Sequence, residues 1–376
     1  MARLRNLAQS IDWLLFIPAL LLVGAGLVTM NSFVKGGDYF FDNQIIWTAL
    51  SVGIFFALSF VDFRFLRRTY VVVVLYFVTI FFLILLFIVG EVVLGAQSRF
   101  NLGIFAVQPA DPAKLVLVLI LAKYFSRRHI EIAHIRHILV SGGYAFLLFA
   151  LVLVQPDFGS AIILASIWFG MVLVSGISKK HFIAVILVAT LAFGGLWAFV
   201  FEDYQKNRIR TFMNPLTDLQ GTGYNAYQST IAVGSGEIVG KGVGYGTQSK
   251  LQFLPEYETD FIFAAFAEEW GFIGVLILFL LFVMVLWRIL SYAFYGASNF
   301  ETLFAVGIAV MFLAHFTVHV GMNIGLLPVT GTTIPFLSYG GSHLITEFGA
   351  LGMLMGMRRY SRTIHREDVD KEFLGV

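Results

Sequence analysis

Ten apolar stretches, each long enough or nearly long enough to cross a lipid bilayer, recur along this chain of 376 residues. A helix needs about 20 mainly apolar residues to cross about 30 Å of hydrocarbon. Hydrophobic residues make up 59% of the chain and charged residues only 13%, whereas a soluble domain has about 25% charged residues. We therefore predict an all-α polytopic membrane protein with about ten transmembrane helices. The predicted spans are 11–31, 44–61, 70–90, 112–125, 138–154, 160–177, 182–200, 261–290, 301–320 and 343–357.

Three of these spans have unusual features. The eighth span could break near Gly271, and the fourth and tenth are short enough to be tilted or partly re-entrant. The first span follows a basic flank and has no small-residue cleavage site after it, so we expect a retained helix and not a signal peptide.

The chain contains no Cys, which excludes disulfides and cysteine-based metal sites or nucleophiles.

The distribution of basic residues predicts the orientation in the membrane. An even number of spans places both termini on one side, and 17 of the 25 Lys and Arg residues fall on that side, against 8 on the other. Because cytoplasmic loops carry an excess of Lys and Arg, we expect both termini to be cytoplasmic. The net charge of +2 does not indicate a nucleic-acid partner.

The sequence predicts a single membrane domain, 1–376, with one large loop outside the membrane. The loop, 201–260, is predicted to be extracytoplasmic and to lie between spans seven and eight, and 358–376 form a short cytoplasmic tail. A loop this long in a compact protein is usually functional or disordered, and its aromatic residues argue against disorder. We expect an ordered lid that faces the substrate.

Asp260 is the first candidate for chemistry, because it lies where the acidic end of this loop meets the eighth span. A carboxylate at a lipid boundary is costly and is retained where it has a partner or a task. Glu268 and Glu269 follow about two turns later, so one of them shares the face of Asp260. Alternatively, they cap the helix or pack against span ten, where Glu347 is another buried acid.

A run of glycines between Gly234 and Gly246 has two interpretations. It lacks the spacing of a nucleotide-binding loop. It can be a tight loop packed against other backbone, or its NH groups can hold an anionic head group. Four nearby basic residues would suit phosphate, although each could also be a solvated surface charge: Arg208, Arg210, Lys241 and Lys250.

Two further acidic positions open membrane spans on the same face. Asp111 and Lys114 are three residues apart and can neutralise each other on one helix face, with Asp111 as the N-cap and Pro112 in the first turn. This ion pair either anchors the helix or belongs to the site. Asp157 either caps span six or faces Asp260, in which case the two carboxylates could bind a cation or act together.

His315 and His319 have the i, i+4 spacing of a helical metal pair. No third ligand is evident, and polar contacts between helices are the better interpretation. No serine-hydrolase motif occurs. The segment 323–342 is too apolar for a solvated loop and too rich in Pro and Gly for a plain helix, so we expect it to wall the site.

Together these motifs resemble the SEDS family of bacterial cell-wall polymerases, which includes RodA, FtsW and SpoVE. The resemblance covers nearly the whole chain, and the GKG and TQS motifs and the short tail resemble the RodA, elongation-type branch. The matching motifs are QPDFGS at 155–160, GKG at 240–242, TQS at 247–249, LPE at 254–256, TDFIF at 259–263, LLPVTG at 326–331 and PFLSYGGS at 335–342.

The resemblance implies a peptidoglycan glycosyltransferase that polymerises lipid II at the outer face of the bacterial cytoplasmic membrane, in cell elongation. It implies work with a class B penicillin-binding transpeptidase, and it places the essential aspartate at Asp260. We expect the following residues to bind substrate or support the site: Asp157, Asp111, Lys114, Arg99, Arg208, Arg210, Lys241, Glu256, Ser338 and Ser342. No cofactor is certain from the sequence, and a divalent cation, Mg²⁺ or Mn²⁺, is the one candidate.

Four positions depart from the family pattern. Asp111 replaces a Glu, Glu258 replaces a His, Phe100 replaces a Trp and His319 replaces an Asn. Two other functions stay open from the sequence, a transporter that flips lipid II and a scaffold that recruits cell-wall enzymes. A transporter would show charges deep within several spans and inverted repeats, whereas the charged residues here cluster at the outer rim.

Overall fold

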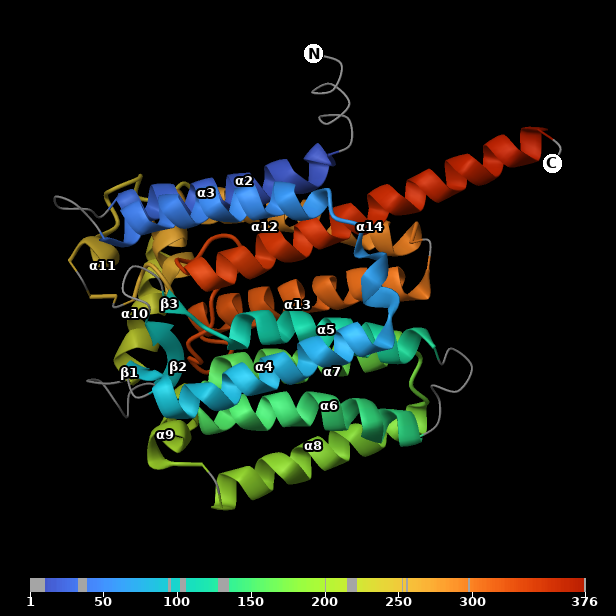
Figure 1. Cartoon of the computed structure of the whole chain (residues 1–376). Coiled ribbons are helices and arrows are strands. Elements are labelled where there is room, and N and C mark those ends of the chain that lie inside the picture. The colour runs from blue at the N-terminus through green and yellow to red at the C-terminus, as the bar shows by residue number, and fades with distance from the viewer. Residues whose placement is uncertain are drawn as a thin grey trace, which may run out of the picture.

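The predicted apolar stretches all form helices in the structure, a computed structural model. It describes residues 11–32, 39–93, 96–101, 106–127, 135–199, 201–214, 222–251, 253–254, 256–296 and 298–374. The ten helices lie side by side as a bundle (Figure 1). They are α2 (Trp13–Asn31), α3 (Tyr39–Ser59), α4 (Thr69–Val89), α5 (Ala110–Ser126), α6 (Ile135–Val154), α7 (Phe158–Val174), α8 (Lys179–Phe199), α12 (Ile262–Phe294), α13 (Asn299–Asn323) and α14 (Gly341–Leu374).

Seven of the described helices are long and apolar enough to cross a bilayer, which makes this a multi-pass membrane protein: α2, α3, α4, α6, α8, α12 and α13. The helices α5 and α7 are shorter, with 17 residues each. The helix α14 continues through the predicted tail to Leu374. The count of ten spans stays a prediction.

The predicted break in the eighth span is confirmed. Within α12, Gly271 has φ 63° and ψ −169°, which is not helical. A Cβ atom at this position would lie 2.2 Å from the backbone nitrogen of Gly240, so the glycine allows the outer loop to pack directly on the helix. Glycine tolerates this backbone conformation because it has no Cβ.

The prediction of an all-α fold is wrong in one region. Residues between α4 and α5 form a small antiparallel sheet in the order β1 (Glu91–Val93), β2 (Ala96–Asn101) and β3 (Ala106–Val107). The sheet lies at one end of the bundle together with three helices of the long loop, α9 (Asp203–Met213), α10 (Thr222–Ser235) and α11 (Thr247–Lys250) (Figure 1). The helix α2 begins and α14 ends at the opposite end (Figure 1).

A charged cluster ties three helices together at that opposite end. Asp12 caps α2, because its Oδ1 accepts a hydrogen bond from the Leu14 nitrogen at 3.2 Å. Its Oδ2 also accepts from Arg288 Nε and Tyr292 Oη, each at 2.8 Å, and pairs with Arg358. These contacts join α2 to α12 and α14. Hydrogen bonds from Arg288, Tyr292 and Arg358 lower the pKa of Asp12 despite its burial.

Candidate active site

Asp260 directly precedes α12, and the amide of Asn323 fixes its backbone. Asn323 Nδ2 donates hydrogen bonds to the carbonyl oxygens of Asp260 at 3.0 Å and His319 at 2.9 Å. Its Oδ1 accepts from the Ala264 nitrogen at 3.2 Å. Asn323 is itself fully buried at the end of α13. The start of α12 is therefore held to the end of α13, and the side chain of Asp260 at this junction is half-buried.

The surroundings of Asp260 raise its pKa to about 7. The largest cause is burial, since a low dielectric disfavours the charged carboxylate. The negative charges of Glu256 and Asp157 raise it further, while the positive charges of Arg208 and Arg99 lower it. Asp260 can therefore accept or release a proton near neutral pH, which is the property required of a general base.

Asp157 combines the two roles that the sequence left open. Its Oδ1 accepts a hydrogen bond from the Ser160 nitrogen at 3.0 Å, so it caps α7. Its Oδ2 accepts from Gln108 Nε2 at 2.7 Å, and its charge acts on Asp260. Asp157 thus lies at the site while it also starts the helix.

Asp111 and Lys114 form the predicted ion pair, and both are buried. Lys114 Nζ lies 3.0 Å from Asp111 Oδ1, and the two side chains are only 4% and 7% exposed. His343 joins the pair from α14, with its Nδ1 3.7 Å from Asp111 Oδ1 and its Nε2 2.7 Å from Glu347 Oε1. The prediction of Asp111 as the N-cap is wrong, because Pro109 occupies that position and Asp111 lies in the first turn of α5.

The segment between α13 and α14 lies against Asp260, as expected. A Cβ atom added at Gly331 would lie 3.5 Å from Asp260 Oδ2. Ser338 is buried and donates from Oγ to the carbonyl oxygen of Thr259 at 2.9 Å. Ser342 Oγ donates to the carbonyl oxygen of Gln108 at 3.2 Å. Both serines were expected to bind substrate or support the site, and the structure places them in contacts that hold its backbone.

The glycine run packs tightly on α12, which confirms the first of its two interpretations. A Cβ atom at Gly240 would lie 2.1 Å from the carbonyl oxygen of Glu269. Lys241 Nζ lies 2.7 Å from the fully buried Glu268 Oε1, which also accepts a hydrogen bond from the Thr247 nitrogen at 2.8 Å. Lys241 therefore pairs with a buried acid of α12, and a role in binding substrate stays a prediction.

A cavity of about 250 Å³ lies between α9, α10 and the segment after α13. Arg208, Thr211 and Tyr227 contribute polar atoms to its wall, and Phe212, Leu327 and Pro328 contribute apolar ones. Arg208 thus connects the cavity with Asp260, on whose pKa its charge acts. Arg210 does not line this cavity; it is exposed and donates a hydrogen bond to Asn207 Oδ1 at 3.4 Å.

Comparison with known proteins places this arrangement in a family. Residues 5–363 match the family of cell cycle proteins formed by FtsW, RodA and SpoVE. The chain belongs to this family.

Two similar proteins align with most of the length of this member of the FtsW, RodA and SpoVE family. Stage V sporulation protein E of Bacillus subtilis is 36% identical over 94% of this chain and 98% of its own length. The peptidoglycan glycosyltransferase MrdB of Escherichia coli K12 is also 36% identical, over 78% of this chain and 79% of its own length.

Solved structures share the fold of this family member. A chain from a peptidoglycan synthase complex that coordinates polymerization and crosslinking superposes with a TM-score of 0.79 at 29% identity. It covers 93% of this chain and 98% of the other. The rod shape determining protein RodA of Thermus thermophilus superposes with a TM-score of 0.69 at 29% identity, over 93% of this chain and 97% of RodA.

The histidine pair of this family member makes polar contacts, as the sequence favoured. His315 Nδ1 lies 3.1 Å from the carbonyl oxygen of Thr333, and His319 Nδ1 lies 2.7 Å from that of Thr332. Across the described ranges, no three His, Asp or Glu side chains cluster as a metal site would require. The described side chains alone therefore do not form a cage for Mg²⁺ or Mn²⁺, and the cation stays a prediction.

Three residues of the site were not recognised in the sequence: Asn323, Gln108 and His343. His343 had a local signal, because it lies four residues before Glu347 on one helix and such residues share a face. Gln108 and Asn323 had none, since their partners Asp157 and Asp260 are 49 and 63 residues away in the chain.

Proposed function

We propose that this chain is a peptidoglycan glycosyltransferase that polymerises lipid II at the outer face of the bacterial cytoplasmic membrane during cell elongation. The observation that carries the proposal is Asp260, a half-buried carboxyl group with a pKa of about 7 just before α12, within reach of the charges of Arg208 and Arg99. The names of its relatives support the reaction, since MrdB is a peptidoglycan glycosyltransferase.

In the proposed step, Asp260 acts as the general base. It takes the proton from the sugar 4-hydroxyl of an acceptor lipid II, and that oxygen forms a bond to the anomeric carbon of the donor chain. The bond between this carbon and the lipid-linked pyrophosphate breaks, and the pyrophosphate leaves with the electron pair. A single base opposite an anionic leaving group predicts inversion at the anomeric carbon.

The leaving pyrophosphate requires positive charge near Asp260. Arg208 and Arg99 provide it, because both already act on the carboxyl group of Asp260. Arg208 is placed to bind phosphate oxygens from the wall of the cavity, where its planar guanidinium can form two parallel hydrogen bonds. Lys114 would not bind the pyrophosphate directly, since its charge is neutralised by Asp111 in the buried ion pair.

We also propose a transpeptidase partner. The similar chain from a peptidoglycan synthase complex belongs to an assembly that coordinates polymerization and crosslinking. A class B penicillin-binding protein of the elongation machinery would perform the crosslinking on the strands that this chain makes. Both proteins would act at the same outer face of the membrane.

Replacing Asp260 tests the proposal. We expect Asp260→Asn to lower polymerisation of labelled lipid II by about 10²- to 10⁴-fold, which is the contribution of a general base. The matched control is Asp203→Asn, which makes the same change at an exposed position at the start of α9. The measurement is the amount of glycan polymer from purified protein, with and without its partner. Polymer at the wild-type rate from Asp260→Asn would overturn the assignment.

The same preparation distinguishes the two alternative functions. Movement of lipid II across vesicle membranes without polymer would indicate a transporter. Neither polymer nor translocation would indicate a scaffold. Polymer that requires Asp260 supports the glycosyltransferase.

A further inference from the structure

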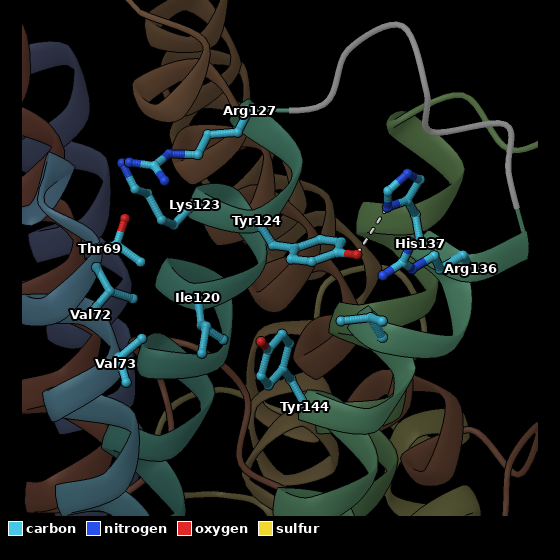
Figure 2. A pocket seen from close by; sticks show the side chains of 11 residues that line it. Thr69, Val72, Val73, Ile120, Lys123, Tyr124, Arg127, Arg136, His137 and Tyr144 are labelled. Atoms are coloured by element: carbon cyan, nitrogen blue, oxygen red, sulfur yellow. Dashed lines mark hydrogen bonds between the residues drawn. The ribbon is translucent and has the colours of Figure 1, made fainter.

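A second and larger cavity, of about 450 Å³, lies between the first turns of α4 and α6 and the last turn of α5 (Figure 2). It is at the other end of α5 from Asp111 and shares no lining residue with the candidate active site. The proposed glycosyl transfer therefore does not explain it.

Basic side chains line the polar part of this cavity. Lys123 and Arg127 lie on one side of Tyr124, and Arg136 and His137 lie on the other (Figure 2). Tyr124 Oη and His137 Nδ1 are 3.0 Å apart, so the tyrosine hydroxyl and the imidazole contact each other within the cavity wall.

Lys123, Arg127 and Arg136 form no ion pair with an acid in the described part of the chain. Both Arg127 and Arg136 are exposed, and neither forms an ion pair with a described residue. Lys123 Nζ donates to the carbonyl oxygen of Arg67, which is a neutral acceptor. Arg67, which does not line the cavity, is paired with an acid, since its Nη2 lies 2.5 Å from Glu301 Oε1. Among the described residues, the cavity therefore has a surplus of positive charge.

The rest of the wall is apolar and reaches the surface of the bundle. It includes Val72, Val73, Ile120 and Val140, beside the hydroxyl-bearing Thr69 and Tyr144. Val73 and Val140 are 36% and 38% exposed, on the helices α4 and α6. A ligand with a negatively charged head and a hydrocarbon chain would satisfy both parts of the wall, whereas a free anion would leave the apolar part unused.

We propose that this cavity binds the head group of an anionic phospholipid. In the orientation expected from the basic residues, the cavity faces the cytoplasmic leaflet, and basic pockets between transmembrane helices on this side suit anionic lipid head groups. Its cations lie on both sides of Tyr124, Lys123 and Arg127 on one side and Arg136 on the other, which suits a lipid with two phosphates, so cardiolipin is the appropriate probe. The acyl chains lie along Val73 and Val140.

Native mass spectrometry of the full chain in neutral detergent, titrated with cardiolipin or with phosphatidylcholine, tests the proposal. We expect cardiolipin to bind at least tenfold more tightly than phosphatidylcholine. The double variant Arg127→Ala, Arg136→Ala should weaken cardiolipin binding by about thirtyfold, from the contribution of two basic residues near a charged membrane surface. The matched control is Lys179→Ala, Lys180→Ala, which removes two exposed charges at the start of α8, outside this cavity.

Equal affinity for the two lipids, or equal losses in the two double variants, would overturn the proposal, since either result means that no specific site exists. A second variant, Val73→Trp, keeps every charge but fills the apolar part, and it should also weaken cardiolipin binding. Displacement of cardiolipin by millimolar inorganic phosphate would assign the cavity to a soluble anion and contradict the lipid. The melting temperature in neutral detergent, unchanged between variants, verifies that each one is folded.

Discussion

Asp260 shows how neighbouring charges set the chemistry of one carboxyl group. Burial and two acids favour its neutral form, and two arginines favour the charged form, so the balance lies near neutral pH. The sequence singled out Glu258 as the negative charge beside Asp260. In the structure Glu256 acts more strongly, while Glu258 is buried and its carbonyl oxygen accepts a hydrogen bond from the Tyr339 nitrogen at 2.8 Å.

The pH dependence of the proposed reaction follows from these charges. A general base is active when deprotonated, so polymerisation should rise with pH and level off above a pKa of about 7. Because Glu256 raises the pKa of Asp260, Glu256→Gln should move the rise to lower pH. Because Arg208 lowers it, Arg208→Gln should move the rise to higher pH. The measurement is kcat/KM against pH.

Glu237→Gln is the matched control for this profile. Glu237 is an exposed acid in the same outer region, and its charge is not among those that act most strongly on Asp260. We expect its profile to match that of the wild type. An unchanged profile in Glu256→Gln would contradict the role of Asp260 as the titrating base.

Residue types and spacing predicted part of the site. Asp111 and Lys114 were recognised because three residues along a helix bring two side chains to one face. The pairing of Lys241 with Glu268 was not predicted, because the two residues lie 27 positions apart and only the folded loop brings them together. Local spacing reveals a contact within one helix, whereas contacts between elements depend on packing that one sequence does not show.

At the scale of elements, the apolar stretches of the sequence predicted the helices of the bundle well. The structure of the polar segments that connect these helices was predicted poorly. Strands β1 to β3 have six residues or fewer, too short for a clear alternating pattern. The helix α9 did have a signal. Glu202 and Gln205 form a capping box at its start, and a capping residue followed three positions later by Glu or Gln is typical of a helix N-terminus.

The contact between α2 and the segment that walls the site depends on one glycine. A Cβ atom at Gly26 would lie 2.2 Å from the carbonyl oxygen of Leu337. We expect Gly26→Ala to cost about 1–3 kcal/mol of stability by overpacking and to slow polymerisation, because this segment also contacts Asp260. The measurements are thermal unfolding in detergent and the polymerisation assay.

Gly24→Ala is the matched control, in the same helix two residues earlier. A Cβ atom at Gly24 would have no neighbour within 4 Å, and alanine favours a helix by up to about 1 kcal/mol over glycine. Its stability should therefore be unchanged or slightly raised. Equal effects of the two substitutions would show that packing against Leu337 is not the cause.

At the scale of the whole molecule, the two ends of the bundle differ in composition and shape. One end carries the small sheet and α9 to α11 (Figure 1). Asp260 lies just before the first residue of α12 and near Arg99 of β2 and Arg208 of α9, whose charges act on it. The other carries the Asp12 cluster and the basic cavity. The excess of Lys and Arg at this second end is the basis for placing it in the cytoplasm.

The absence of Cys from the sequence allows a direct test of orientation. A single cysteine at Tyr245→Cys, an exposed position in the outer loop, should react with a membrane-impermeant thiol reagent on intact spheroplasts. Lys179→Cys, exposed at the start of α8, should react only after the membrane is opened. The reverse pattern would place the termini outside. Labelling is read from the mass of the purified protein.

The short length of α5 and α7 affects how easily water could compete with the acceptor sugar in the proposed reaction. At about 1.5 Å per residue, 17 residues span about 25 Å, which is less than the roughly 30 Å of hydrocarbon. Asp111 lies in the first turn of α5 and Asp157 caps α7, and these two short helices pack against each other. If Asp260 is the proposed base and lies at an end of this pair that is recessed in the bilayer, it meets fewer water molecules, and hydrolysis of the donor is the side reaction that such exclusion suppresses. Under the proposed function, two short helices would therefore favour extension of the donor strand over its hydrolytic release.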